Sequence, residues 1–278
     1  MKLIKTQDKG GKMYKNKQDV KDRVQEHYDI LIKKGYEVVG VFLNGSQNYE
    51  LEYKGSDVDT KAIILPSFDD FLFGRKKVST TLILDNNEHI DLKDIRMMFE
   101  NFKKQNINFI EILFTEYKIM NPKYEKLFNI LFEKNEEIAH YNNYKALNCI
   151  MGMSKEKYKA LEHPYPATKD KIEKFGWDGK QLHHILRLNR FLKRYINNEL
   201  YNKCLISEDK NYLIKVKQNI IHTLDEARII AKNTDKETYS IVKKYMSENK
   251  ILINENIEIL LNDVLSKIVR LRFEEELK

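Results

Sequence analysis

Short apolar runs separated by polar turns are the main pattern in the first part of the chain. The runs Val38–Leu43 and Lys61–Leu65 are rich in β-branched residues, and they predict two adjacent buried strands. Val78–Leu84 and Glu88–Leu92 predict two more strands, with the turn residues Asp85-Asn86-Asn87 between them. We therefore expect this part of the chain to build a β-sheet.

Helical spacing dominates on either side of these strands. Apolar residues recur every three or four positions from Val20 to Leu31, which predicts a helix that ends at Gly35. Beyond about Tyr124 the spacing is helical almost throughout. The other segments with helical spacing are 93–104, 144–161, 179–195, 220–231 and 257–271. Tyr212–Val216 is an exception, because this short apolar run predicts a strand.

The change from strand spacing to helical spacing predicts two domains, and 278 residues are enough to form both. We expect an α+β domain over residues 1–135 and a mostly helical domain over residues 136–278. The 49 Lys and Arg residues outnumber the 42 Asp and Glu residues, and the resulting charge of +7 is compatible with a polyanionic partner such as nucleic acid.

Cysteine content and hydropathy bear on the cellular compartment. The chain has only two cysteines, Cys149 and Cys204, which favours a reducing environment. The first residues lack an apolar segment of signal-peptide length, and no apolar stretch is long enough to span a membrane. We therefore expect a cytoplasmic protein that does not associate with a membrane.

Two acidic residues, Asp57 and Asp59, lead into the second predicted strand. Side chains two positions apart on a strand share a face, so both carboxylates are expected to point the same way. Adjacent carboxylates repel, and the pKa of one of them rises unless a cation lies between them. Mg²⁺ suits such an oxygen-only site and usually also binds phosphate oxygens. The alternative is a solvated acid pair at the start of a strand.

Gly45 and Ser46 follow the first predicted strand, where a turn or a helix should begin. Glycine lets backbone N–H groups approach a phosphate closely, and the serine hydroxyl adds a donor. Alone, each motif is better explained as an ordinary turn or surface feature. In this order on adjacent strands, they predict metal-assisted phosphoryl or nucleotidyl transfer.

The order Gly45-Ser46 followed by Ser56-Asp57-Val58-Asp59 resembles the signature of the polymerase-β-type nucleotidyltransferase superfamily. The resemblance implies a polymerase-β-like core, which is a mixed sheet with flanking helices, and a third carboxylate on a neighbouring strand. Asp91 is the best candidate, because it follows the turn at residues 85–87 and lies between apolar residues. Asp94 is its competitor, although it fits better as an acid in the first turn of a helix.

Two further blocks are similar to one branch of that superfamily, the predicted nucleotidyltransferases of bacteria and phages, some of which are linked to RNA repair. The first block is Glu111-Ile112-Leu113-Phe114, which we expect to pack against the sheet. The second is Gly-aromatic-Asp-x-Lys followed by His-x-x-Arg-Leu. Its matching residues are Gly176, Trp177, Asp178, Lys180, His184, Arg187 and Leu188. The departures are Gly179 and His183, so either His183 or His184 stays a candidate for nucleotide contact.

Lys180, His184 and Arg187 should share one face of the predicted helix 179–195, because each residue turns the helix by about 100°. Such a cationic stripe repels itself, and a nearby anion would relieve the repulsion. A solvated face of a basic protein is the alternative. The resemblance favours the first interpretation, in which the three residues bind nucleotide.

Taken together, the resemblance implies a Mg²⁺-dependent nucleotidyltransferase. Such an enzyme transfers a nucleoside monophosphate from a nucleoside triphosphate to an acceptor hydroxyl, and we expect the acceptor to be RNA, either a tRNA or an RNA end. Asp57, Asp59 and Asp91 would hold two Mg²⁺ ions, which Mn²⁺ can replace, and Asp91 would help to deprotonate the acceptor. Gly45 and Ser46 would bind the β- and γ-phosphates.

Two alternatives to transfer onto RNA stay open. In the first, the same chemistry modifies a hydroxyl of a protein or a small molecule, in a toxin, antitoxin or defence setting. In the second, the protein is a regulator that binds nucleotide without turnover. Transfer to nucleic acid predicts salt-sensitive binding, whereas transfer to a protein does not.

Overall fold

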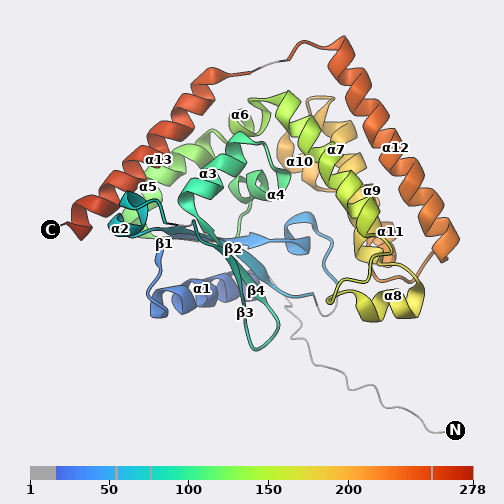
Figure 1. The fold of residues 1–278 in the computed structure, drawn as a ribbon, viewed down its shortest axis with the longest axis horizontal. Coiled ribbons are helices and arrows are strands. Elements are labelled where there is room, and N and C mark those ends of the chain that lie inside the picture. The colour runs from blue at the N-terminus through green and yellow to red at the C-terminus, as the bar shows by residue number, and fades with distance from the viewer. Residues whose placement is uncertain (1–16, 54–55, 76, 252, 278) are drawn as a thin grey trace, which may run out of the picture.

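A five-stranded mixed sheet lies at the centre of the α+β fold in the computed structural model, which describes residues 17–53, 56–75, 77–251 and 253–277 (Figure 1). The strands are β1 (Glu37–Asn44), β2 (Asp59–Leu65), β3 (Ser79–Ile83), β4 (His89–Asp94) and β5 (Lys118–Met120). Their order is β3-β4-β2-β1-β5, with β2 and β4 parallel and the other neighbours antiparallel. The expected α+β class and the pairing of the first two strands are confirmed.

Both faces of the sheet are covered, which explains why β1 and β2 have continuous apolar sequences. On one face, Val41 and Ile64 join an apolar cluster with α1 (Lys17–Lys33). On the other face, Phe42 and Ile63 join a larger cluster with α3 (Ile95–Lys103) and α5 (Pro122–Glu133). In Figure 1, α1 lies below the sheet and α3 and α5 lie above it. The sheet is therefore held rigidly between two layers of helices.

The remaining helices fall into two groups: short helices close to the sheet, and a series of helices in the second half of the chain. The short helices near the sheet are η1 (Ser46–Tyr49), α2 (Phe68–Leu72), α4 (Ile107–Ile110), η2 (Glu111–Leu113) and α6 (Asn135–His140), of which η1 and η2 are 3-10 turns. The helices that follow are α7 (Asn143–Ala160), α8 (Lys169–Phe175), α9 (Gly179–Tyr195), α10 (Tyr201–Leu205), α11 (Lys210–Lys217), α12 (Leu224–Glu248) and α13 (Glu255–Glu276). The helical character expected for this part of the chain is confirmed.

The prediction of a strand at Tyr212–Val216 is wrong, because this segment lies within α11. A short apolar run does not distinguish a strand from a buried helix. In α11, Leu213 and Val216 are buried three positions apart on one helical face. The helix packs against α9, so the apolar residues serve helix–helix contact rather than a sheet.

The start of α9 explains the glycine at position 179, which departs from the resemblance block. A Cβ atom on Gly179 would collide with the carbonyl oxygen of Val216 and with the Asn219 side chain. Asn219 Oδ1 also accepts a hydrogen bond from the Gly179 N–H, at 3.0 Å. Glycine therefore allows α11 to approach the N terminus of α9 closely.

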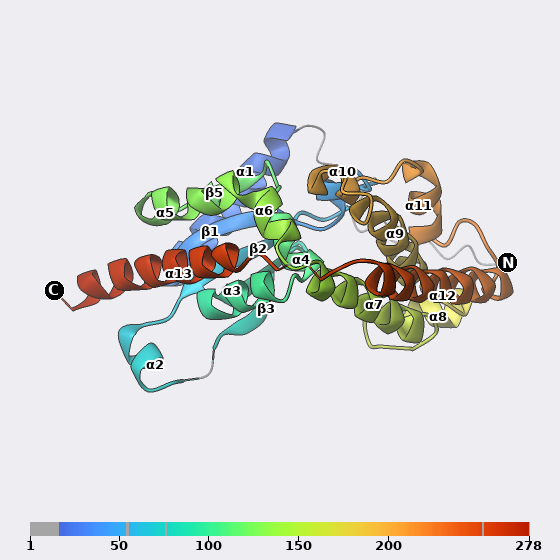
Figure 2. The ribbon, with the colours of Figure 1, turned by 90° about the horizontal axis from the view of Figure 1, so that it is seen from above.

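The last helix, α13, returns to the sheet-bearing part of the molecule, where it packs against α3 and α5 (Figure 2). The Phe273 ring lies 5.3 Å from the ring centroid of Phe68 and 5.3 Å from that of Phe71. Among the described residues, no helix has both the length and the apolar composition needed to cross a membrane.

Candidate functional site

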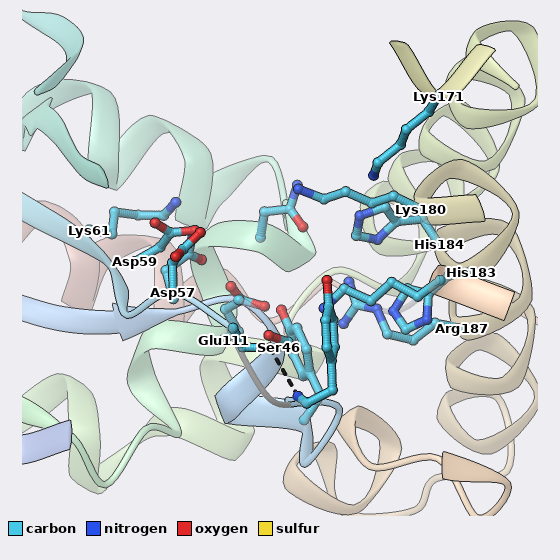
Figure 3. A pocket seen from close by; sticks show the side chains of 17 residues that line it. Ser46, Asp57, Asp59, Lys61, Glu111, Lys171, Lys180, His183, His184 and Arg187 are labelled. Carbon is cyan, nitrogen blue, oxygen red and sulfur yellow. Dashed lines mark hydrogen bonds between the residues drawn. The ribbon is translucent and has the colours of Figure 1, made fainter. Parts of the chain in front are cut away.

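A cavity of about 390 Å³ lies between the edge of the sheet and the helices α9 and α11 (Figure 3). The sheet side contributes carboxylates and the Gly45-Ser46 turn, and the helical side contributes cationic side chains. Seven of the eight residues predicted for the site line this cavity: Gly45, Ser46, Asp57, Asp59, Lys180, His184 and Arg187. The structure therefore brings most of the predicted site together from two distant parts of the chain.

The acidic wall of the cavity is formed by Asp57 and Asp59. Asp59 begins β2, and its Oδ1 accepts a hydrogen bond of 2.9 Å from the backbone N–H of His89. Asp57 lies two residues earlier, and although its side chain is exposed, partial desolvation and then repulsion from Asp59 raise its pKa. The repulsion expected from the sequence is therefore present. A cation between the two carboxylates would relieve it.

The turn after β1 also lines the cavity, next to Asp57 and Asp59. Gly45 has a φ of 90°, in the left-handed region that favours glycine, and Ser46 begins η1 directly after it. The side chain of Gln47 donates to the backbone oxygen of Asp57 at 3.3 Å, which ties the turn to the acidic wall. The predicted change from strand to turn is confirmed.

The basic wall is the face of α9 that carries Lys180, His184 and Arg187 (Figure 3). The expected common face is present, because all three side chains line the cavity. Arg187 is only 3% exposed, and its guanidinium carbon lies 3.9 Å from the centroid of the Tyr49 ring. Within the part of the chain that the structure describes, its Nε has no hydrogen-bond partner. Arg187 is therefore a buried cation with a free donor.

Both candidate histidines, His183 and His184, line the cavity. Burial lowers the pKa of His183 to about 3, and its Nδ1 lies 3.1 Å from the carbonyl oxygen of Leu213. Burial also lowers the pKa of His184 well below its usual value, and the neighbouring His183 and Arg187 add to this effect. Near neutral pH, both imidazoles are therefore uncharged and contribute as hydrogen-bonding groups.

Two cations of the basic wall were not predicted from the sequence: Lys171 from α8 and Lys217 from α11. Burial, together with repulsion from Lys180 and Lys171, lowers the pKa of Lys217 to about 8. Its Nζ lies 5.0 Å from the centroid of the Tyr53 ring. No local motif marks these lysines, because they come from separate helices that meet only in the folded chain.

Asp91 lies on β4 beside β2, as expected, but it does not line the cavity. Its carboxylate pairs with Lys61 at 3.2 Å and with Lys93 at 2.9 Å. Asp94, the competing candidate, is the N-cap of α3 and accepts a hydrogen bond from the Arg96 N–H at 2.9 Å. Across the described ranges, no three side chains of His, Cys, Asp or Glu are grouped so that they could hold a metal ion.

Glu111 lies in η2 and is 2% exposed, consistent with the packing role expected for its segment. It also lines the cavity, which the sequence did not indicate. Burial raises the pKa of Glu111 to about 8, and Arg187 opposes this increase. In the described parts of the chain, its Oε2 has no hydrogen-bond partner. A buried acid is therefore available to a ligand.

Comparison with protein-family models and with curated proteins finds no match for this chain. The function is therefore inferred from the chemistry of the cavity and from the sequence resemblance.

Proposed function

We propose that the protein is a nucleotidyltransferase with a polymerase-β-like core, which transfers a nucleoside monophosphate from a nucleoside triphosphate to a hydroxyl of an RNA acceptor. One observation carries this proposal: a single cavity has an acidic wall at Asp57 and Asp59 and a basic wall around Arg187. A nucleoside triphosphate with its divalent cation has the complementary arrangement of charge, because the cation meets the carboxylates and the phosphates meet the basic wall.

The residues of the acidic wall fit a Mg²⁺ ion. Asp57 and Asp59 supply carboxylate oxygens to one cavity, and the raised pKa of Asp57 reflects partial desolvation and repulsion that a cation would offset. Mg²⁺ is commonly held by one or two carboxylates together with substrate phosphates and water. When bound, the ion would neutralise charge on the reacting phosphate. A second ion at Asp91 stays a prediction from the resemblance.

The other residues of the cavity are suited to holding the triphosphate. The N–H groups at Gly45 and Ser46 and the serine hydroxyl provide donors for the β- and γ-phosphates. Lys180 and Arg187 lie on the opposite wall, where they would stabilise the charge that develops on the leaving pyrophosphate. In the transfer, the acceptor oxygen bonds to the α-phosphorus, the bond to pyrophosphate breaks, and the hydroxyl proton passes to a carboxylate of the acidic wall.

The choice of RNA as the acceptor rests on charge and on the resemblance. The net charge is +7, and Lys171, Lys180 and Lys217 are gathered on one side of the cavity. An RNA end carries phosphates that such lysines attract, and its binding should weaken as salt increases. A hydroxyl on an uncharged protein surface would not need this excess of cations.

The test is to incubate the protein with each α-labelled nucleoside triphosphate, Mg²⁺, total RNA and cell extract, and then to treat samples with ribonuclease or protease. Label that ribonuclease removes supports the proposal. Label that only protease removes would assign a protein acceptor. Nucleotide binding without incorporation into any fraction would assign a regulator. Asp57→Asn serves as the inactive control, because it removes a carboxylate from the acidic wall.

A further inference from the structure

Glu111 and Arg187 reach the cavity from opposite sides, one from η2 and the other from α9 (Figure 3). Their exposed fractions are only 2% and 3%. The two charges interact, since each affects the pKa of the other. Nevertheless, no hydrogen bond or ion pair joins Glu111 to Arg187 among the described residues, and Glu111 Oε2 and Arg187 Nε have no hydrogen-bond partner there. This buried acid and this buried base are neighbours that do not pair.

Both side chains leave polar atoms without partners. Glu111 Oε2 and Arg187 Nε have none in the described residues. A buried polar atom without a hydrogen bond destabilises the fold, and a charged group does so more strongly. A fold that keeps two such groups at one cavity is most easily explained if a ligand satisfies them. The ligand must accept hydrogen bonds from Arg187 and must also suit Glu111.

The surroundings of Glu111 favour its uncharged form. No N–H donor stabilises a carboxylate here among the hydrogen bonds of the described chain, and burial penalises the ionised group. Its pKa is accordingly raised to about 8. An anion bound at Arg187 would neutralise the cation that opposes this increase, so the carboxyl group would hold its proton more firmly in the complex. A protonated carboxyl is a hydrogen-bond donor.

We propose that Glu111 binds the nucleotide as an uncharged carboxyl group, donating a hydrogen bond to a phosphate oxygen that Arg187 also holds. This inference rests on the proposed function, because it assumes a phosphate ligand in the cavity. Glu111 therefore has a different role from the acidic wall. Asp57 and Asp59 bind the divalent cation, whereas Glu111 binds the phosphate anion. Binding of the ligand then requires a proton on Glu111, so it should weaken above the pH at which Glu111 ionises.

Other titratable groups near Glu111 could also make binding depend on pH, and their contribution has to be distinguished from that of Glu111. Arg187 on α9 and Tyr201 on α10 interact with it electrostatically, and the pKa of Tyr201 is raised well above its usual value by burial. Asp57 and Asp59 lie on the acidic wall of the same cavity. Lys217 matters most, because burial lowers its pKa to about 8 and it too loses its charge in this range. The experiment therefore requires one variant at Glu111 and another at Lys217.

The probe is inorganic triphosphate in metal-free buffer, titrated calorimetrically into the wild-type chain, Glu111→Gln and Lys217→Met. At about pH 9, wild-type binding should take up nearly two protons, and each variant should take up about one, because Glu111 and Lys217 are then mostly deprotonated before binding. Above about pH 8, affinity in the wild type should fall about tenfold more per pH unit than in Glu111→Gln. Glu116→Gln, a change at an exposed acid five residues away, should behave like the wild type.

The possible outcomes distinguish this inference from the proposed function. Equal proton uptake in the wild type and Glu111→Gln, with triphosphate still bound, would overturn the role of Glu111 and leave the proposed function standing. Failure of the wild type to bind either triphosphate or nucleotide would overturn the proposed function itself. If Glu111→Gln binds with wild-type pH dependence but transfers far more slowly, Glu111 moves a proton in the reaction, and the inference is also wrong. Should Glu111→Gln fail to fold, proton uptake by the wild type and Lys217→Met still decides the question.

Discussion

The guanidinium group of Arg187 stacks on the ring of Tyr49, with 3.9 Å between the guanidinium carbon and the ring centroid. This contact joins α9 to the 3-10 turn η1, which begins at Ser46 directly after Gly45. An aromatic face attracts a cation without neutralising its charge, so Tyr49 holds Arg187 in place while its N–H groups remain available. The stacking therefore positions a buried cation for an anionic ligand.

Arg187→Met is the most direct test of the basic wall. Methionine retains apolar contact with Tyr49 but removes the charge. We expect affinity for nucleoside triphosphate to fall at least about tenfold, since hydrogen bonds to charged groups contribute about 1.5–3 kcal/mol. The melting temperature should not fall, because the change removes a buried cation whose Nε has no hydrogen-bond partner among the described residues. Both quantities are measurable by calorimetry and thermal unfolding.

The control for Arg187→Met is Lys193→Met on the same helix, where the lysine is exposed and pairs with Glu237 at 2.8 Å. This change removes one positive charge from α9 without altering the cavity, so its affinity should match that of the wild type. Equal affinity in the wild type and Arg187→Met would show that Arg187 does not bind phosphate.

Asp57→Asn should abolish transfer while stabilising the chain in metal-free buffer. The pKa of Asp57 is raised in the folded state, by partial desolvation and by Asp59. Above the pKa of the unfolded chain, about 4, the folded state therefore bears a penalty that asparagine lacks. The melting temperature should exceed that of the wild type near neutral pH, and the difference should disappear below about pH 4. Thermal unfolding in a chelator across this pH range measures it.

Asp59→Asn should likewise abolish transfer, with a loss of several orders of magnitude. Near-full activity in either aspartate variant with Mg²⁺ present would contradict the assignment of the acidic wall. Nucleotide binding without metal provides the accompanying control, because the basic wall is intact in both variants.

Asp91→Asn and Asp94→Asn distinguish a role in turnover from a role in the stability of the fold. The resemblance predicts that Asp91→Asn cripples turnover and largely preserves nucleotide affinity. It should also lower stability, because Lys61, which is 4% exposed, loses a partner at 3.2 Å. Asp94→Asn should affect turnover much less and lower stability through the lost pairing with Arg96. Reversed effects on turnover would transfer the catalytic role to Asp94.

Lys217→Met should increase stability at the expense of binding. Burial and neighbouring lysines lower the pKa of Lys217 to about 8 in the folded chain. The unfolded chain therefore binds more protons between about pH 8 and pH 10.5, and the penalty on the folded state is complete below pH 8. The variant should melt at a higher temperature than the wild type at neutral pH, with the advantage shrinking as the pH approaches about 10.

Triphosphate affinity should fall in Lys217→Met, because a cation leaves the basic wall. Lys215→Met, at an exposed position on the same helix, is the matched control and should change neither quantity appreciably. A loss of stability in Lys217→Met at neutral pH would mean that the packing of this lysine outweighs the electrostatic penalty.

The amino-acid sequence by itself determined the features that depend on neighbouring residues. The alternation of side chains along a strand was enough to place Asp57 and Asp59 together. The turn of a helix was enough to place Lys180 and Arg187 on one face, and Gly45 marked the end of β1. Each of these inferences uses local backbone geometry, which follows from short sequence spacing, and in each case the structure agrees.

Only the tertiary structure decided which distant residues meet. The parallel register of β2 and β4 places Lys61 beside Asp91, so the carboxylate is paired with lysine instead of lining the cavity. The packing of α11 on α9 brings Lys217 to the basic wall, although the residues just before it, Tyr212–Val216, were predicted as a strand. The Glu111 side chain lines the cavity, although its segment was expected only to pack against the sheet. These outcomes depend on packing between elements far apart in the chain, which residue spacing within one element does not specify.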